Sequence, residues 1–149
     1  MALARTPRNK ARILLIEDKL DQRDIISRAM ADALPEVSLI LVSSVTEAER
    51  YLQLCQDSAS GWPQLILLDL YLPQRETGIE FLQRLKTSTS PTYLIPVLVF
   101  SVSSLKQDIQ DAYTMGANSY LLKPMTYKGW LDHLQIIREY WFVHTLFTR

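Results

Sequence analysis

Residues 65–73 read Leu-Ile-Leu-Leu-Asp-Leu-Tyr-Leu-Pro. An unbroken run of four apolar residues, preceded by Pro63 and stopped by Pro73, is typical of a short strand that is buried on both faces of a parallel sheet. Asp69 then stands at the carboxyl end of this strand. Ligands bind at that end of open α/β sheets, so Asp69 is a candidate functional residue, although a lone Asp after a strand often only caps the next loop.

Four further apolar runs predict four more strands, at residues 13–16, 39–42, 97–100 and 120–122. Amphipathic helices are predicted between and after the strands, at residues 21–34, 46–55, 79–85, 108–115 and 127–141. A capping box of Thr46 and Glu49 is expected to begin the second helix, and a polar turn that ends at Gly78 is expected to precede the third. Strands that alternate with helices in this way predict an α/β fold, a doubly wound five-stranded parallel sheet with five helices on its two faces.

The length and composition favour one domain with no strongly charged partner. The chain has 149 residues, 48% of them hydrophobic, and its 16 basic residues balance 16 acidic ones, so nucleic acid or an anionic membrane is not an expected partner. A lone Cys55 and the lack of a signal peptide or a membrane-length apolar run favour a cytoplasmic location. We expect a mobile arm over residues 1–10 and a single domain over residues 11–149.

Side chains that can carry chemistry follow four of the five predicted strands. Glu17 and Asp18 follow the first, Asp69 the third, Ser101 the fourth and Lys123 the fifth. Each residue alone has an ordinary explanation. The acidic residues are commonly solvated in loops, Ser101 can cap the end of its strand, and Lys123 can be a surface lysine. Together they would converge on one edge of a parallel sheet, where the coincidence of five suitable residues indicates a site.

The chemistry of this set points to a phosphoryl group and a divalent cation. Three carboxylates repel one another unless a cation lies among them, and oxygen ligands of this kind suit Mg²⁺. A hydroxyl and an ammonium group are suited to the equatorial oxygens of a phosphoryl group. The set would therefore allow Asp69 to attack a phosphoryl donor and to hold the resulting acyl phosphate.

Four motifs in this order resemble the receiver domain of two-component response regulators. They are Ile-Glu-Asp at 16–18, Leu-Leu-Asp-Leu-Tyr-Leu-Pro at 67–73, Val-Phe-Ser at 99–101 and Gly-Ala-Asn-Ser-Tyr-Leu-Leu-Lys-Pro at 116–124. The resemblance covers nearly all of residues 11–141. It implies the flavodoxin-like receiver fold, with the strand order 2-1-3-4-5.

The resemblance also implies roles for individual residues. Asp69 matches the phosphoacceptor, and Lys123 the lysine that binds the phosphoryl group. Glu17, Asp18, Asp69 and the backbone carbonyl of Tyr71 match the Mg²⁺ ligands. The chain would then catalyse only its own phosphotransfer and autodephosphorylation, and it would not be an enzyme in the usual sense.

Conformational switching is implied for two further residues. Ser101 matches the hydroxyl that moves onto the phosphoryl group, and Tyr120 matches the aromatic residue that turns inward behind it. The bond between Lys123 and Pro124 is commonly cis in the family, so we expect it to be cis here.

Three residues near the phosphoryl position are expected to modulate rates: Tyr71, Val102 and Ser103. The Tyr71 ring would obstruct the attacking water, and Val102, bulkier than the small residue typical of the family, would obstruct small phosphoryl donors. The resemblance also implies that the turn at residues 73–78 is one residue longer than usual in the family, so we expect a different local geometry after Asp69.

Three functions are compatible with this pattern. The favoured one is a stand-alone response regulator that accepts a phosphoryl group from a sensor histidine kinase and contacts a downstream target protein, since we expect no output domain after the last predicted helix. An aspartate-nucleophile phosphatase is disfavoured because such enzymes carry a second Asp two residues after the nucleophile, where this chain has Tyr71. A degenerate receiver, acting as a binding module without phosphorylation, is favoured if Val102 and the longer turn close the site.

The last predicted helix carries two apolar stripes. The inner stripe is Tyr127, Trp130, Leu131, Leu134, Ile137 and Trp141, and the outer residues are Ile136, Tyr140, Phe142, Val143, Leu146 and Phe147. The outer stripe either folds back over its own domain or pairs with a second copy. We expect a homodimer through the fourth helix, the fifth strand, the fifth helix and the C-terminal tail, a face that the family commonly uses for pairing.

Overall fold

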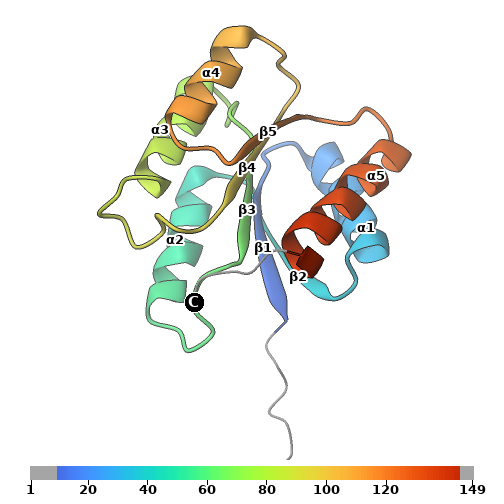
Figure 1. Cartoon of the computed structure of the whole chain (residues 1–149), viewed down its shortest axis with the longest axis horizontal. Helices are drawn as coiled ribbons and strands as arrows, with labels where there is room; N and C mark the ends of the chain where they lie inside the picture. Colours follow the sequence, from blue (N-terminus) through green and yellow to red (C-terminus); the bar gives the residue numbers. More distant parts are fainter. Residues whose placement is uncertain (1–9, 145–149) are drawn as a thin grey trace, which may run out of the picture.

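Five parallel strands form one sheet in the computed structural model, which describes residues 10–144 (Figure 1). The strands are β1 (Ala11–Ile16), β2 (Val37–Val42), β3 (Leu65–Leu68), β4 (Val97–Ser101) and β5 (Ser119–Leu122). Their order across the sheet is β2-β1-β3-β4-β5, which confirms the predicted fold class. The arm predicted over residues 1–10 lies, apart from Lys10, outside the described residues.

Helices cover both faces of this sheet. They are α1 (Leu20–Ala33), α2 (Val45–Gln56), α3 (Arg75–Leu85), α4 (Lys106–Thr114) and α5 (Tyr127–Ile137), with a π-helical segment η1 (Arg138–His144) after α5. Figure 1 shows α1 and α5 on one side of the sheet and α2, α3 and α4 on the other. Within residues 10–144 no helix combines the length and the apolarity needed to cross a bilayer.

The continuous apolar run of β3 is explained by burial on both faces. Leu65 and Leu67 belong to the core that packs under α1 and α5, whereas Ile66 and Leu68 belong to the core under α2 and α3. All four side chains are fully buried. Since consecutive side chains of a strand point to opposite faces, a strand between two helical layers has no position for a polar residue until it ends.

The start of α2 differs from the prediction. The Ser44 hydroxyl accepts a hydrogen bond from the Glu47 backbone N–H at 3.1 Å, and the Glu47 carboxylate accepts one from the Ser43 N–H at 2.9 Å. The capping box predicted at Thr46 and Glu49 is therefore wrong by two residues. The chain contains two overlapping Ser/Thr-x-x-Glu patterns, and the earlier one lets the helix begin directly after β2.

The start of α3 was also predicted wrongly. The helix begins at Arg75, so residues 75–78, which were predicted as part of a polar turn, are helical. Gly78 is buried against the backbone of the preceding loop, and a Cβ atom there would lie 2.0 Å from the Leu70 carbonyl oxygen. Glycine in a helix usually lowers the helical propensity, but here the close approach of two backbone segments requires it.

The proline geometry differs from the expectation as well. Among the described residues, the cis peptide bond is Leu72–Pro73, and the cis bond expected at Lys123–Pro124 is not found. The two isomers of a bond before proline differ little in free energy, so a Lys-Pro pair in a sequence does not by itself fix the isomer.

The inner stripe of the last helix packs largely as predicted. Trp130, Leu134 and Ile137 are buried in the core beside α1, and the Trp130 ring lies 5.2 Å from that of Phe100. Phe142, expected in the outer stripe, packs against the same core, and Tyr127 is exposed. The other outer residues described with side chains, Ile136 and Tyr140, are exposed, whereas Leu146 and Phe147 lie outside the described residues.

Candidate functional site

An acid cluster lies at the carboxyl ends of β1 and β3. The parallel register places Ile16 opposite Leu68, so Glu17 and Asp69, the next residue of each strand, leave the sheet side by side. Carboxylate oxygens of Glu17, Asp18 and Asp69 all lie within 4.8 Å of one another. The structure thus brings together the three carboxylates that the sequence pattern selected.

Lys123 joins this cluster from the loop after β5. Its Nζ donates hydrogen bonds to Oε2 of Glu17 at 2.5 Å and to Oδ2 of Asp69 at 2.8 Å, and all three side chains are buried. Burial alone would lower the pKa of Lys123, but the bonds to Asp69 and Glu17 outweigh it and hold that pKa above its ordinary value. Lys123 is therefore charged and neutralises part of the negative charge of the cluster.

The remaining oxygens of the cluster differ in their partners. One Asp69 oxygen accepts a bond from the Tyr71 N–H at 3.1 Å, and one Glu17 oxygen accepts a bond from the Lys19 N–H at 3.2 Å. Oδ1 of Asp18 is buried without a hydrogen-bond partner within the described chain. Burial raises the pKa of Glu17, although Lys123 acts in the opposite direction. An unpaired carboxylate oxygen beside two further carboxylates fits a hard divalent cation such as Mg²⁺.

Both predicted switch residues contact Ser103, which lies in the loop between β4 and α4. The fully buried Ser101 hydroxyl accepts a hydrogen bond from the Ser103 N–H at 3.1 Å. The Tyr120 hydroxyl donates to the Ser103 carbonyl at 2.7 Å. Ser101, at the end of β4, pairs with Leu122, the last residue of β5. Lys123 follows Leu122, so the Ser101 hydroxyl and the lysine lie at neighbouring strand ends.

Tyr71 and Val102, two of the residues expected to modulate rates, differ in their exposure to solvent. Tyr71 is half-buried, and its hydroxyl donates to Oδ2 of Asp108 at 2.7 Å. Val102 is 67% exposed. The effects of Tyr71, Val102 and Ser103 on rates remain predictions.

Asp108 and Arg75 belong to this region but were not selected from the sequence. The Asp108 carboxylate accepts hydrogen bonds from Tyr71, from the Ser103 hydroxyl at 2.5 Å and from Nε of Arg75 at 2.5 Å. An Asp in the first turn of a helix is common because it interacts favourably with the helix dipole, so its sequence position carries no sign of a network.

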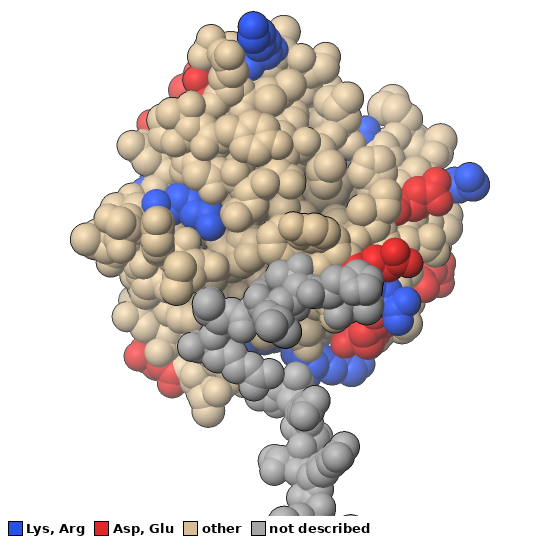
Figure 2. Space-filling view, viewed as in Figure 1, with Lys and Arg blue, Asp and Glu red and all other residues tan. Residues whose placement is uncertain are grey.

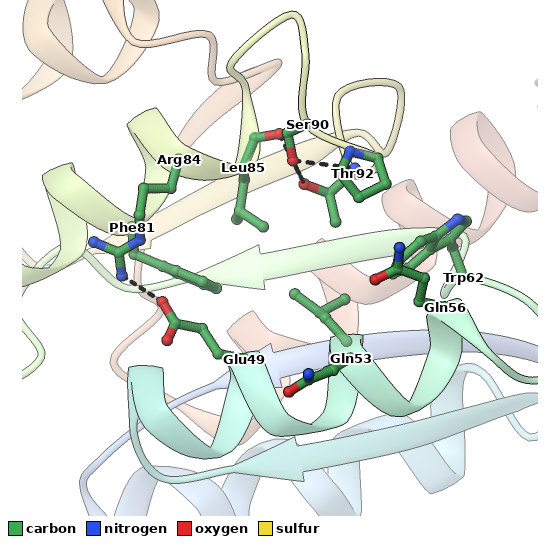
Figure 3. Close-up of a pocket in the computed structure, with 11 residues that line it drawn as sticks. Glu49, Gln53, Gln56, Trp62, Phe81, Arg84, Leu85, Ser90 and Thr92 are labelled. Carbon is green, nitrogen blue, oxygen red and sulfur yellow. Dashed lines mark hydrogen bonds and ion pairs between the residues drawn. The ribbon is translucent and has the colours of Figure 1, made fainter.

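A separate cavity lies at the opposite end of the sheet from the acid cluster. It has a volume of about 210 Å³ and lies between α2, α3 and the loops that enter β3 and β4 (Figure 3). Trp62 and Phe81 give it an apolar lining, and Glu49 and Arg84 form an ion pair of 2.5 Å at its side. This cavity lacks the clustered carboxylates and the lysine, so we do not assign the chemistry to it.

The chain matches a known family over most of its length. The model of the response regulator receiver domain matches residues 13–135. Among curated proteins, the probable methanogenesis regulatory protein FilR2 of Methanothrix harundinacea is 33% identical over 129 residues, which cover 87% of this chain and 82% of FilR2. The response regulator Rcp1 of Synechocystis is 30% identical over 130 residues, 87% of each chain.

Solved structures show the same similarity. The phosphorylated cyanobacterial phytochrome response regulator RcpA superimposes with a TM-score of 0.79 at 30% identity, over 95% of this chain and 100% of RcpA. The Mn²⁺-bound form of Rcp1 gives a TM-score of 0.78 at 28% identity, over 93% of this chain and 99% of Rcp1.

Proposed function

Because the chain belongs to the response regulator receiver domain family, we propose that it is a stand-alone response regulator that accepts a phosphoryl group on Asp69 from a histidine kinase. Residues 11–149 would form the receiver, and its phosphorylated state would be read by contact with a downstream target protein. The observation that carries the proposal is the buried contact of Lys123 with Asp69, next to an Asp18 oxygen without a partner.

The proposed reaction is a transfer between two protein side chains. An Asp69 oxygen attacks the phosphorus of a phosphohistidine, the new O–P bond forms, and the P–N bond to the donor imidazole breaks. Lys123, which now donates a hydrogen bond to Asp69, would donate one to a phosphoryl oxygen on Asp69. Ser101 would turn from the Ser103 N–H toward the same phosphoryl group.

The metal proposal rests on the donor set. Asp18, Asp69, Glu17 and the Tyr71 backbone carbonyl would hold Mg²⁺, and Asp18 has the oxygen that lacks another partner within the described chain. A bound Mg²⁺ supplies positive charge that offsets the carboxylates and the incoming phosphoryl group. The Mn²⁺-bound form of Rcp1 is a precedent for a divalent cation in a similar protein.

Asp18→Asn is expected to weaken Mg²⁺ binding by about tenfold or more, because the charge and number of ligands set the affinity of such sites. Calorimetric titration of the purified protein with MgCl₂ would measure the change. The same substitution at Asp21, which is exposed in the first turn of α1, is the matched control and should leave the affinity unchanged. Equal affinities of the Asp18→Asn variant and the wild type would contradict the metal proposal, provided that circular dichroism shows both folded.

One of the two grounds for the degenerate receiver is weakened, because the Val102 side chain points largely into solvent. We therefore do not propose a phosphorylation-independent binding module.

We further propose that the chain pairs with a second copy through α4, β5 and α5. In Figure 1, β5 lies between α4 and α5. Figure 2 shows from the same side that charged side chains lie mostly at the rim of the part of this face that is not covered by grey atoms. Exposed apolar side chains on these elements and the loops beside them support the proposal: Leu105, Tyr113, Leu122, Met125, Ile136 and Tyr140.

Sedimentation of the wild type is expected to show a dimer at micromolar concentration, at least with beryllium trifluoride as a phosphoryl mimic. Ile136→Glu should shift it to the monomer, because a charge in an apolar interface is left without solvent or partner. Leu54→Glu changes a similarly exposed apolar residue on α2, outside the proposed interface, and should leave the dimer intact. A wild-type chain that stays monomeric with and without the mimic would rule out this interface.

A further inference from the structure

Asp108 is a buried carboxylate outside the acid cluster. Its residue is 2% exposed, and its two oxygens accept bonds from Tyr71, Ser103 and Arg75. These donors come from three places: the loop after β3, the loop after β4 and the first turn of α3. Burial alone would raise the pKa of Asp108, but the bonds from Ser103, Arg75 and Tyr71 outweigh it and hold that pKa below its ordinary value.

Tyr71 forms hydrogen bonds through its backbone and through its side chain. Its backbone N–H donates to Asp69 at 3.1 Å, and its hydroxyl donates to Asp108 at 2.7 Å. The side chain therefore extends from the phosphoacceptor to α4, and the position of the ring depends on the carboxylate that receives its hydroxyl.

Ser103 links the same carboxylate to the switch residues. Its N–H donates to Ser101, its carbonyl accepts from Tyr120, and its hydroxyl donates to Asp108. If the Ser101 hydroxyl moves, the Ser103 N–H loses its hydrogen-bond acceptor. The other two hydrogen bonds of Ser103, with Tyr120 and Asp108, remain. One residue of α4 thus contacts both loops that flank Asp69.

We propose that Asp108 is a positioning residue of the phosphorylation site, which fixes the Tyr71 ring and Ser103 to α4 and thereby slows hydrolysis of the acyl phosphate. This inference rests on the proposed function. In the hydrolysis, a water oxygen attacks phosphorus, the bond between phosphorus and the Asp69 oxygen breaks, and inorganic phosphate and the Asp69 carboxylate are released, with the water proton going to the phosphate. Tyr71 follows Asp69 by two residues, and a ring fixed at this position would restrict the approach of that water.

The first test compares decay rates of the phosphorylated protein. Wild type, Tyr71→Phe, Asp108→Ala and the double variant are labelled with acetyl phosphate and MgCl₂, the donor is removed, and the remaining phosphoprotein is followed on phosphate-affinity gels. Each single variant should decay about fivefold faster, as the loss of a hydrogen bond to a charged group allows. The double variant should decay no faster than the faster single variant, because both changes remove the same bond.

The matched control is Asp111→Ala. Asp111 accepts hydrogen bonds from Arg75 and Gln107, whereas Tyr71 and Ser103 donate to Asp108. The phosphorylated Asp111→Ala variant should therefore decay within about twofold of the wild-type rate. Wild-type decay in both Tyr71→Phe and Asp108→Ala, or effects of the two changes that multiply in the double variant, would overturn the proposal.

The second test needs no phosphoryl group. Hydrogen exchange of the unphosphorylated protein should be faster across α4 in Asp108→Ala than in Asp111→Ala, since the links from α4 to both loops are lost. Equal exchange of α4 in these two variants would overturn the proposal. A wild-type chain that takes up no phosphoryl group from a phosphorylated histidine kinase would contradict the proposed function, while the exchange experiment would still decide the role of Asp108.

Discussion

Asp69→Asn is expected to abolish uptake of a phosphoryl group from a histidine kinase. The amide has nearly the shape of the carboxylate but lacks the anionic oxygen that attacks phosphorus. The fold should persist, because the Asn side-chain oxygen can still accept the hydrogen bond that Lys123 now donates to Asp69. Transfer from a phosphorylated kinase, read on phosphate-affinity gels, measures the effect.

Asp57→Asn is the matched control for this substitution. Asp57 is exposed at the end of α2, away from the acid cluster, so its amide variant should accept the phosphoryl group like the wild type. Phosphorylation of the Asp69→Asn variant at the wild-type rate would show that another residue is the phosphoacceptor.

Lys123→Met is expected to destabilise the protein strongly when no divalent cation is present. Methionine keeps most of the side-chain volume but removes the ammonium group between Glu17 and Asp69, and breaking a buried ion pair in this way costs about 3–5 kcal/mol. Added Mg²⁺ should restore part of the stability, because it offsets the same carboxylates and binds the folded state. Phosphotransfer should fall as well, since Lys123 would no longer contact the phosphoryl group.

Urea unfolding in EDTA and in MgCl₂ would measure both effects. Lys128→Met serves as the control, because Lys128 is exposed on α5 and its ion pair with Asp132 spans 3.8 Å. Exposed pairs of this kind contribute about 0–1 kcal/mol. A Lys123→Met variant as stable in EDTA as the Lys128→Met variant would show that Lys123 does not balance the charge of the cluster.

The strands and the acid cluster could be predicted because few physical constraints determine them. A strand between two layers of helices must be apolar at every position, so the run at Leu65–Leu68 is visible in the sequence. Parallel strands then bring their carboxyl ends to one edge, and the register of β1 and β3 places Glu17 beside Asp69. The types of residue at these ends were enough to predict the cluster of carboxylates with a lysine that the structure shows.

Helix starts were less predictable because local signals compete. Two overlapping capping patterns precede α2, and only the packing of α2 after β2 selects Ser44. The polar residues before Gly78 resemble a turn, but α3 starts among them, and the close contact of Gly78 with Leu70 follows from the tertiary fold. Boundaries of this kind depend on packing more than on propensity.

The Asp108 network could not be predicted from the sequence. Tyr71 and Asp108 are separated by 37 residues, and their contact requires that α4 and the loop after β3 be placed by the sheet. The sequence shows the residue types but not which donors reach a given carboxylate. Residues that act through others are therefore found only after the fold is known.

Mass-spectrometric mapping of the phosphorylated chain tests the central claim most directly. The purified wild type is incubated with a phosphorylated histidine kinase, with and without MgCl₂, and the modified residue is located after proteolysis. The account predicts modification at Asp69 that depends on MgCl₂, because the acid cluster needs a cation to accept a further negative group. Modification at another residue, or equal modification of Asp69 in EDTA, would contradict it.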